Sequence, residues 1–260
     1  MTGAAIQWYP GHMARAMRRL GDDLRVVDVV IEVVDARVPS SGANPALDRI
    51  AAHKTRLRVL TREDLADPEE TERWLERFRR HGSSIAFAAK EPSGPARLRA
   101  AVTAAALGLR GARAIVLGIP NAGKSTVINA LAGRKVARTE NRAGVTRAAQ
   151  WFRLETGLEV MDTAGILVPK IDTDEARWRL AMVGAVPRAR FDPEGVIERF
   201  HCWAETEHGA NAVPDLATFA QSRGFVRRGN LLDAHNAAWA YLKDFDEGRF
   251  GRMTLEKPAP

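Results

Sequence analysis

Four residues have the types and the spacing of a phosphate-binding loop: Gly118, Gly123, Lys124 and Ser125. In a loop of the form Gly-x-x-x-x-Gly-Lys-Ser, backbone N–H groups surround the β-phosphate of a nucleotide. The lysine then reaches the β- and γ-phosphates, and the serine hydroxyl binds Mg²⁺. An apolar stretch at 112–118 precedes the loop and an amphipathic one follows it, which is the strand-to-helix setting that this chemistry needs. The nucleotide-binding residues expected in this stretch are Asn121, Ala122, Gly123, Lys124, Ser125 and Thr126.

A second group of residues, further along the chain, could complete a magnesium and γ-phosphate site. Asp162, in "VMDTAGI", stands at the end of an apolar stretch, where a carboxylate can hold Mg²⁺ through water. The N–H of Gly165 would sense the γ-phosphate. Between the two motifs lies the polar segment "RTENRAGVTRA", in which Thr146 is either the residue that completes the Mg²⁺ shell or an ordinary loop threonine. The predicted magnesium ligands are Ser125, Thr146 and Asp162.

The base-reading part of the site is predicted upstream of the phosphate loop. A GTPase needs an acidic residue that binds N1 and N2 of guanine, in an Asn-Lys-x-Asp motif, and no such motif follows residue 165. "VLTREDL" places Asp64 for this contact at the end of an apolar stretch, and "AFAAKEPSG" would form a supporting loop. The base-binding residues expected here are Thr61, Arg62, Asp64, Ala88, Ala89 and Lys90. The chain is therefore interpreted as a GTPase in circularly permuted order, a rearrangement that surface loops tolerate.

Alternating apolar and amphipathic stretches indicate the elements that would position these residues. Strands are predicted at 26–36, 56–60, 83–89, 112–118, 148–154 and 158–162. Helices are predicted at 67–82, 93–109 and 124–133, with Asp67 as the N-cap of the first. This alternation favours an α/β fold with a mostly parallel sheet covered on both faces.

The spacing of apolar residues along the sequence changes near residue 187. Three stretches, 191–209, 215–225 and 231–248, carry apolar residues at helical spacing and contain no convincing strand. We therefore predict a P-loop GTPase domain with permuted motif order at 1–175, followed by a small all-α domain at 187–260. The segment 166–186 would connect the two.

Composition narrows the class of protein further. The 260 residues carry a net charge of +7, and this basic excess suits polyanionic partners, although solvated basic faces would explain it equally well. Cys202 is the single cysteine, which excludes an internal disulfide and fits a reducing cytosol. No apolar run is long enough to span a bilayer, and the first residues lack the pattern of a secretory signal. A cytoplasmic protein is expected.

With these motifs placed, the chain resembles the circularly permuted ribosome-assembly GTPases of the bacterial YlqF (RbgA) family. The resemblance extends over nearly the full length and rests on "WYPGHMARAMRRL", "DVVIEVVDARVP", "GIPNAGKSTVINAL", "AGVTRAAQW", "DTAGI" and "RGFVRRGN". It implies GTP hydrolysis coupled to maturation of the large (50S) ribosomal subunit, with the helical domain contacting rRNA. The partners implied are GTP and GDP, the large subunit and its rRNA; no membrane partner is expected, and the protein should be a monomer off the ribosome.

The resemblance also implies a catalytic residue and a second cofactor. Ile166 occupies the place where many GTPases have a water-orienting glutamine, and it cannot do this. The resemblance points instead to His12 of "PGHM", with the alternative that His12 caps a helix starting near Met13. Asn121 resembles the residue that helps to bind K⁺ in cation-activated GTPases, so the expected cofactors are Mg²⁺ and K⁺.

Departures from the family pattern leave rival functions open. The Asn-Lys-x-Asp motif is here Thr61-Arg62-Glu63-Asp64, and Ala88 and Ala143 replace a serine and a proline. We expect that Thr61 cannot replace the bonds of the amide to neighbouring loops, whereas the stem of Arg62 could still cover the base. The alternatives are an RNA-binding assembly scaffold with weak or vestigial nucleotide binding and, third, an ATPase.

Two further clusters are candidates for binding. Three arginines flank two glycines in a turn between predicted helices and are expected to contact rRNA phosphates, unless the turn is simply solvated. These RNA-binding candidates are Arg223, Arg227 and Arg228. His201, Cys202 and His208 have no further ligand at a spacing that suits zinc.

Overall fold

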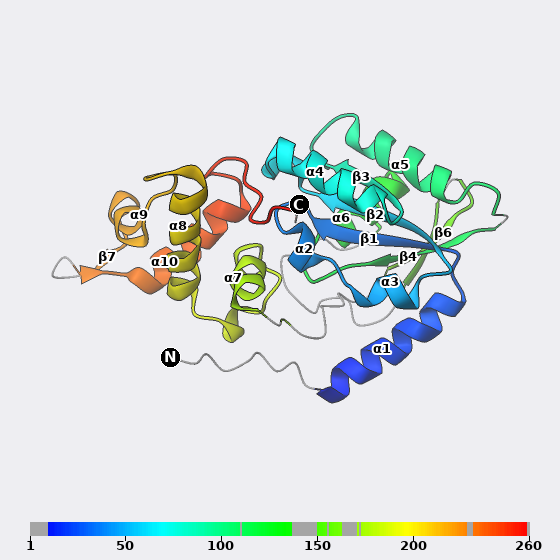
Figure 1. Ribbon diagram of the computed structural model, residues 1–260, viewed down its shortest axis with the longest axis horizontal. Helices are drawn as coiled ribbons and strands as arrows, with labels where there is room; N and C mark the ends of the chain where they lie inside the picture. The colour runs from blue at the N-terminus through cyan, green and yellow to red at the C-terminus, as the bar shows by residue number, and fades with distance from the viewer. Residues whose placement is uncertain are drawn as a thin grey trace.

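The computed structural model describes most of the chain. It covers residues 10–109, 111–136, 150–154, 156–162, 171, 173–227 and 231–258, with the side chains of 10–17 and 150 left aside. Figure 1 shows two lobes, one built around a sheet and one built from helices. None of the helices in these ranges is both long and apolar enough to cross a membrane.

A six-stranded sheet forms the core of the first lobe, in the order β3-β2-β1-β4-β6-β5. All neighbouring pairs are parallel except β5 and β6, which are antiparallel. The strands are β1 Val29–Asp35, β2 Thr55–Thr61, β3 Ser83–Phe87, β4 Arg113–Leu117, β5 Gln150–Arg153 and β6 Glu159–Asp162. The mostly parallel sheet that the sequence predicts is confirmed.

The pairing of β1 with β4 joins the two halves of this lobe. Val29 lies opposite Ala114, and Glu32 lies opposite Leu117, although about eighty residues separate the strands in the chain. All seven residues of β1 are buried, as expected for a central parallel strand with both faces covered. The carboxyl ends of β1, β2, β3, β4 and β6 consequently meet at one edge of the sheet.

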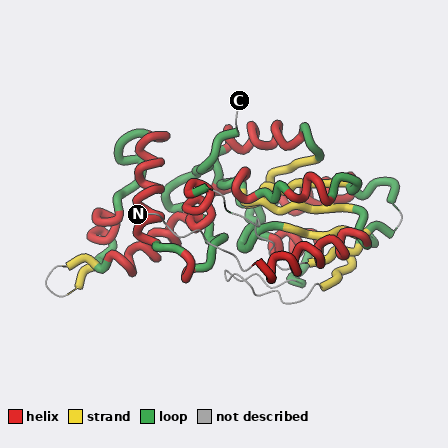
Figure 2. The backbone as a smooth tube through the Cα atoms, turned by 60° about the horizontal axis from the view of Figure 1, so that its bottom comes forward, coloured by secondary structure: helices red, strands yellow, loops and turns green. Residues whose placement is uncertain are grey.

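Helices cover both faces of the sheet, as Figure 2 shows. Alternate residues of the strands point to opposite faces. Val30 and Ile115 pack with Leu20 and Leu24 on one face, whereas Val116 belongs to the main core on the other face. The helices of this lobe are α1 Pro10–Arg25, α2 Pro39–Gly42, α3 Ala46–Ile50, α4 Pro68–Arg79, α5 Gly94–Ala105 and α6 Lys124–Ala132.

Helix α4 illustrates how local sequence sets an element. The side chain of Asp67 accepts a hydrogen bond from the N–H of Glu70 (2.9 Å), and Pro68 occupies the first turn. Trp74 and Phe78, one turn apart, are buried against the sheet side. The N-cap predicted from the sequence is therefore confirmed.

The second lobe differs in detail from an all-helical domain. Its helices are α7 Asp174–Met182, α8 Pro193–His208, α9 Leu216–Ser222 and α10 Ala234–Asp246. The structure adds a short antiparallel pair, β7 Val226–Arg227 and β8 Leu231–Leu232. These strands are two residues long and exposed, so they leave no alternating pattern that sequence reading could detect.

Helix α7 belongs with the helical lobe although the sequence analysis places it in the connector. Trp178 is buried, and its ring lies 6.2 Å from the ring of Trp203 on α8. The ring of Phe200 in turn stacks on that of Trp203 at 5.9 Å. Because α7 shares this aromatic core, the helical lobe begins well before residue 187.

The C-terminal segment after α10 returns to the first lobe, which carries the predicted nucleotide site and is called the nucleotide lobe below. It ends beside α2 and α4 in Figure 1. The N–H of Leu255 donates to the carbonyl of Arg37 (2.7 Å). The carboxylate of Glu256 accepts from the backbone N–H groups of Ser40 (2.6 Å) and Ser41 (3.0 Å). A domain boundary at 187 with everything beyond it in the helical domain is therefore too simple, because 252–257 completes the surface of the first lobe.

Candidate functional site

The phosphate-binding loop lies between β4 and α6, with glycines where no side chain fits. A Cβ atom on Gly118 would lie 2.4 Å from the carbonyl oxygen of Val33 on the neighbouring strand. Gly123 has φ +93°, and Asn121 has φ +60°, both in the left-handed region. Left-handed residues that lead into a helix N-terminus form a concavity of N–H groups that attracts anions. The described loop thus has the build of a phosphate site.

Lys124 is the cation of this loop. Its Nζ atom donates to the carbonyls of Gly118 (3.2 Å) and Ile119 (2.9 Å). Burial lowers the pKa of Lys124 to about 8, while the carboxylate of Asp162 acts in the opposite direction. Asp162 is itself buried, at the end of β6. The two residues predicted to serve phosphate and magnesium therefore share one site at the sheet edge.

Thr61 connects the predicted base loop to the phosphate loop. Its hydroxyl lies 2.6 Å from the carbonyl oxygen of Ala122 and 3.1 Å from that of Val34. A hydroxyl has one proton, so it donates to one of these carbonyls at a time, and Ala122 is the closer. The expectation that Thr61 cannot replace the bonds of the amide is wrong for the contact with the phosphate loop, because the carbonyl of Ala122 lies within reach of the shorter side chain.

The other base-loop residues lie at the same edge of the sheet. Asp64 is exposed in a short 3-10 helix, Glu63–Leu65, directly after β2. Ala88 is buried after β3, and Ala89 and Lys90 follow it on the surface. The topology thus brings the loops after β2, β3 and β4 together, and the roles of these residues in base binding stay predictions.

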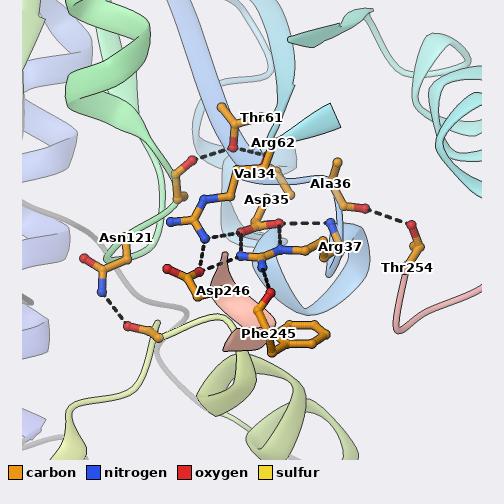
Figure 3. A network of polar contacts seen from close by, with 12 residues as sticks. Val34, Asp35, Ala36, Arg37, Thr61, Arg62, Asn121, Phe245, Asp246 and Thr254 are labelled. Atoms are coloured by element: carbon orange, nitrogen blue, oxygen red, sulfur yellow. Dashed lines mark hydrogen bonds and ion pairs between the residues drawn. The ribbon is translucent and has the colours of Figure 1, made fainter. Parts of the chain in front are cut away.

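Arg62, at the sheet edge, reaches toward the helical lobe. It has φ +57°, and its guanidinium pairs with Asp246 at the end of α10 and lies 3.7 Å from Asp35 (Figure 3). Asp35 and Asp246 were not singled out by the sequence analysis. The signal that could have found Asp35 is its place beside Arg37 at the end of a continuous apolar run, where charged residues need partners.

Asn121 also contacts the helical lobe. Its side-chain amide donates to the carbonyl of Gly184, just after α7, at 2.6 Å. The nitrogen end of the amide is therefore occupied, and its oxygen is the atom that a K⁺ ion would take. The phosphate loop contacts the helical lobe through Asn121, and the base loop contacts it through Arg62.

The donor set suits magnesium better than a transition metal. Ser125, in the first turn of α6, and the carboxylate of Asp162 are hard oxygen ligands, which Mg²⁺ prefers alongside phosphate and water. Within the described ranges, no group of three or more His, Cys, Asp or Glu side chains is arranged to hold a metal ion. That finding extends to His201, Cys202 and His208.

Several predicted residues cannot be placed. Thr146, Gly165 and Arg228 lie outside the described residues. His12 lies in the first turn of α1, which begins at Pro10, so it does not precede the helix as an N-cap would; its side chain lies outside the description. The catalytic and γ-phosphate-sensing roles stay predictions.

The fold and the loop together define a class: a P-loop GTPase in which the base-binding half precedes the phosphate-binding half. A family model described as "50S ribosome-binding GTPase" matches residues 113–189. The chain is 35% identical over 282 residues to ribosome biogenesis GTPase A of Bacillus cereus, covering 97% of this chain and 94% of that protein. It is 32% identical over 256 residues to the Thermotoga maritima protein of the same name, covering 97% and 95%.

Solved structures agree with these relatives. A GNP-bound YlqF from T. maritima superposes with a TM-score of 0.74 at 29% identity, covering 94% of this chain and 98% of that one. A GDP-bound YlqF gives a TM-score of 0.73 at 31% identity, covering 93% and 99%. The chain belongs to the ribosome biogenesis GTPase A family, and it is a GTPase.

The Thr61 bridge leads to a test of the altered motif. Thr61→Val keeps the shape of the side chain but leaves the carbonyl of Ala122 without its donor. We expect the free energy of unfolding to fall by about 1–3 kcal/mol and GDP affinity to fall with it, because the two loops lose their link. Urea denaturation and GDP titration measure both. Thr103→Val, on the exposed side of α5, is the matched control, and equal effects of the two substitutions would contradict the bridging role.

The pKa of Lys124 gives a pH dependence. A bound phosphate favours the charged lysine, so above its pKa of about 8 the free protein must take up a proton to bind nucleotide. GDP affinity should be nearly constant up to that pH and roughly tenfold weaker one unit above it. GDP titrations between pH 7 and 9 measure this. Lys124→Met should bind weakly with no such slope; a parent protein whose affinity is flat through pH 9 would refute the assignment.

Proposed function

We propose that this GTPase acts in the cytoplasm as an assembly factor for the large ribosomal subunit, with Asp64 reading guanine and the helical lobe contacting rRNA. The observation that carries the nucleotide part is the bond from Thr61 to Ala122, which fastens the base loop to the phosphate loop despite the altered motif. The ribosomal part rests on the name shared by the relatives, ribosome biogenesis GTPase A. We infer a monomer off the ribosome.

The cofactors follow from the donor atoms at the sheet edge. Ser125, Asp162 and Thr146 would hold Mg²⁺, and Asn121 would contribute its amide oxygen to K⁺. Bound Mg²⁺ would offset negative charge on the phosphates. Lys124 would move its Nζ atom from the carbonyls of Gly118 and Ile119 onto the phosphate oxygens. His12 would orient the attacking water, since Ile166 has no group that can do so.

The rRNA contact would use the basic end of the helical lobe. Arg227 pairs with Asp233 at 2.8 Å, yet its side chain is 64% exposed. Arg223 pairs with Asp244 and is also exposed. The Arg227–Asp233 pair lies at the surface, and ion pairs of this kind are weak enough for an RNA phosphate to compete with them. The intact phosphate loop favours an assembly factor that binds and hydrolyses GTP over an RNA-binding scaffold with vestigial nucleotide binding.

Guanine selectivity tests the base-reading role. Asp64→Asn should weaken GTP binding roughly tenfold or more, because a charge-assisted hydrogen bond of about 1.5–3 kcal/mol is lost. The unmodified protein should prefer GTP to ATP and turn GTP over faster with K⁺ and large subunits than without them. Titration and phosphate release measure these quantities. Asp67→Asn, a helix cap outside the proposed site, is the control. Equal binding of GTP and ATP by the parent would refute the proposal.

Salt dependence tests the rRNA contact. Arg227→Ala should weaken binding to large subunits and flatten the slope of log affinity against log salt by about one, since one phosphate contact is removed. GTP affinity should not change, because Arg227 pairs with Asp233 within its own lobe and not with the loops of the nucleotide site. Sedimentation with large subunits at several salt concentrations measures the slope. Arg73→Ala, an exposed arginine of α4, is the control, and an unchanged slope for Arg227→Ala would contradict the role.

A further inference from the structure

Four charged side chains join the base loop to the end of the helical lobe, as Figure 3 shows. The carboxylate of Asp35 accepts from Nε (3.0 Å) and Nη2 (2.8 Å) of Arg37, and both residues are buried. Nη2 of Arg37 also donates to Asp246 at 3.1 Å. Arg62 pairs with the same oxygen of Asp246. Two carboxylates and two guanidiniums therefore balance in charge at the interface between the lobes.

Asp246 is held firmly enough to serve as an anchor. Nη1 of Arg37 lies 3.5 Å from the carbonyl of Phe245, and its guanidinium lies 5.2 Å from the Phe245 ring. Phe245 itself is buried in the core of the helical lobe. Two contacts therefore hold Asp246 in place independently of Arg62. Arg37 of the nucleotide lobe binds its carboxylate, and the adjacent Phe245 packs in the core of the helical lobe.

Arg62 stands between two residues of the nucleotide site. Thr61, before it, is bonded to the phosphate loop, and Asp64, two residues later, is the proposed guanine contact. Arg62 also lines a cleft of about 640 Å³ between the lobes, together with Asn121 and Asp246. A long side chain has many rotamers, and an arginine stem can lie on an apolar ring while its charged end is in water or paired; a fixed partner for that end restricts the stem to fewer rotamers.

We propose that Asp246, on the helical lobe, is a positioning residue of the guanine site. It holds the guanidinium of Arg62, and this keeps the apolar stem of Arg62 over the face of the base. The inference rests on the proposed role of the 61–64 loop. It makes the helical lobe a contributor to nucleotide affinity, so that by reciprocity the nucleotide stabilises this arrangement of the lobes.

A double-mutant cycle in the full chain tests the proposal, with a fluorescent GDP and Mg²⁺ as the probe. Asp246→Asn and Arg62→Met should each weaken GDP binding about threefold to tenfold, and the double variant should be no weaker than the weaker single one. Asp246→Glu should recover most of the affinity. Asp244→Asn, whose carboxylate pairs with Arg223 and Arg249 within the helical lobe, should bind GDP as the parent does.

The ratio of GDP to ADP affinity separates this role from that of Asp64. The stem of Arg62 covers the ring face of either purine, so Asp246→Asn should leave the ratio unchanged, whereas Asp64→Asn should reduce it. Parent-like GDP affinity in Asp246→Asn, or losses that multiply in the double variant, would overturn the inference while leaving the base loop intact. Parent-like affinity in Asp64→Asn would overturn the base loop itself. If Asp246→Asn does not fold, Arg62→Met decides, since it leaves the Arg37–Asp246 pair in place.

Discussion

The parallel pairing of β1 with β4 is the constraint on which the rest of the structure depends. It places the first strand of the sheet beside the strand that leads into the phosphate loop, in the register Val29 to Ala114. Because β2 pairs with the other side of β1, the loop after β2 ends next to the loop after β4. The permuted order of the chain has no consequence for the site, since a sheet depends on which strands are neighbours and not on the order in which they were connected.

Buried charge fixes the second lobe on the first. Burial alone would raise the pKa of Asp35, but the guanidinium of Arg37 outweighs it and holds this pKa below its usual value. The pKa of Arg37 is raised for the matching reason, despite its burial, by Asp35 and Asp246. Burying such a network costs desolvation free energy, and removing one partner is strongly destabilising. The network therefore favours one placement of the second lobe on the first. The returning segment adds the carboxylate of Glu256, which accepts hydrogen bonds from the backbone N–H groups of Ser40 and Ser41.

The substitution of Thr61 for the usual asparagine shows why a motif is an incomplete guide. A threonine can donate one hydrogen bond, and the sequence indicates only that it is shorter and has fewer donors than an amide. In the folded chain the carbonyl of Ala122 lies 2.6 Å from its hydroxyl, and Gly123 leaves room for its methyl group. The altered motif still joins the base loop to the phosphate loop, through one hydroxyl.

The sequence by itself determined the strands of the six-stranded sheet, the phosphate loop and the family, because apolar periodicity, glycine spacing and Gly-x-x-x-x-Gly-Lys-Ser are local signals. It also predicted the positions of Lys124, at the start of α6 after β4, and of Asp162, at the end of β6, and parallel strands bring both to one edge of the sheet. Only the tertiary structure decided that α7 packs with the helical lobe, that 252–257 returns to the first lobe, and that Arg62 pairs with Asp246. These are contacts between residues as many as 218 positions apart. The local sequence around a charged residue does not identify the distant partner that neutralises it.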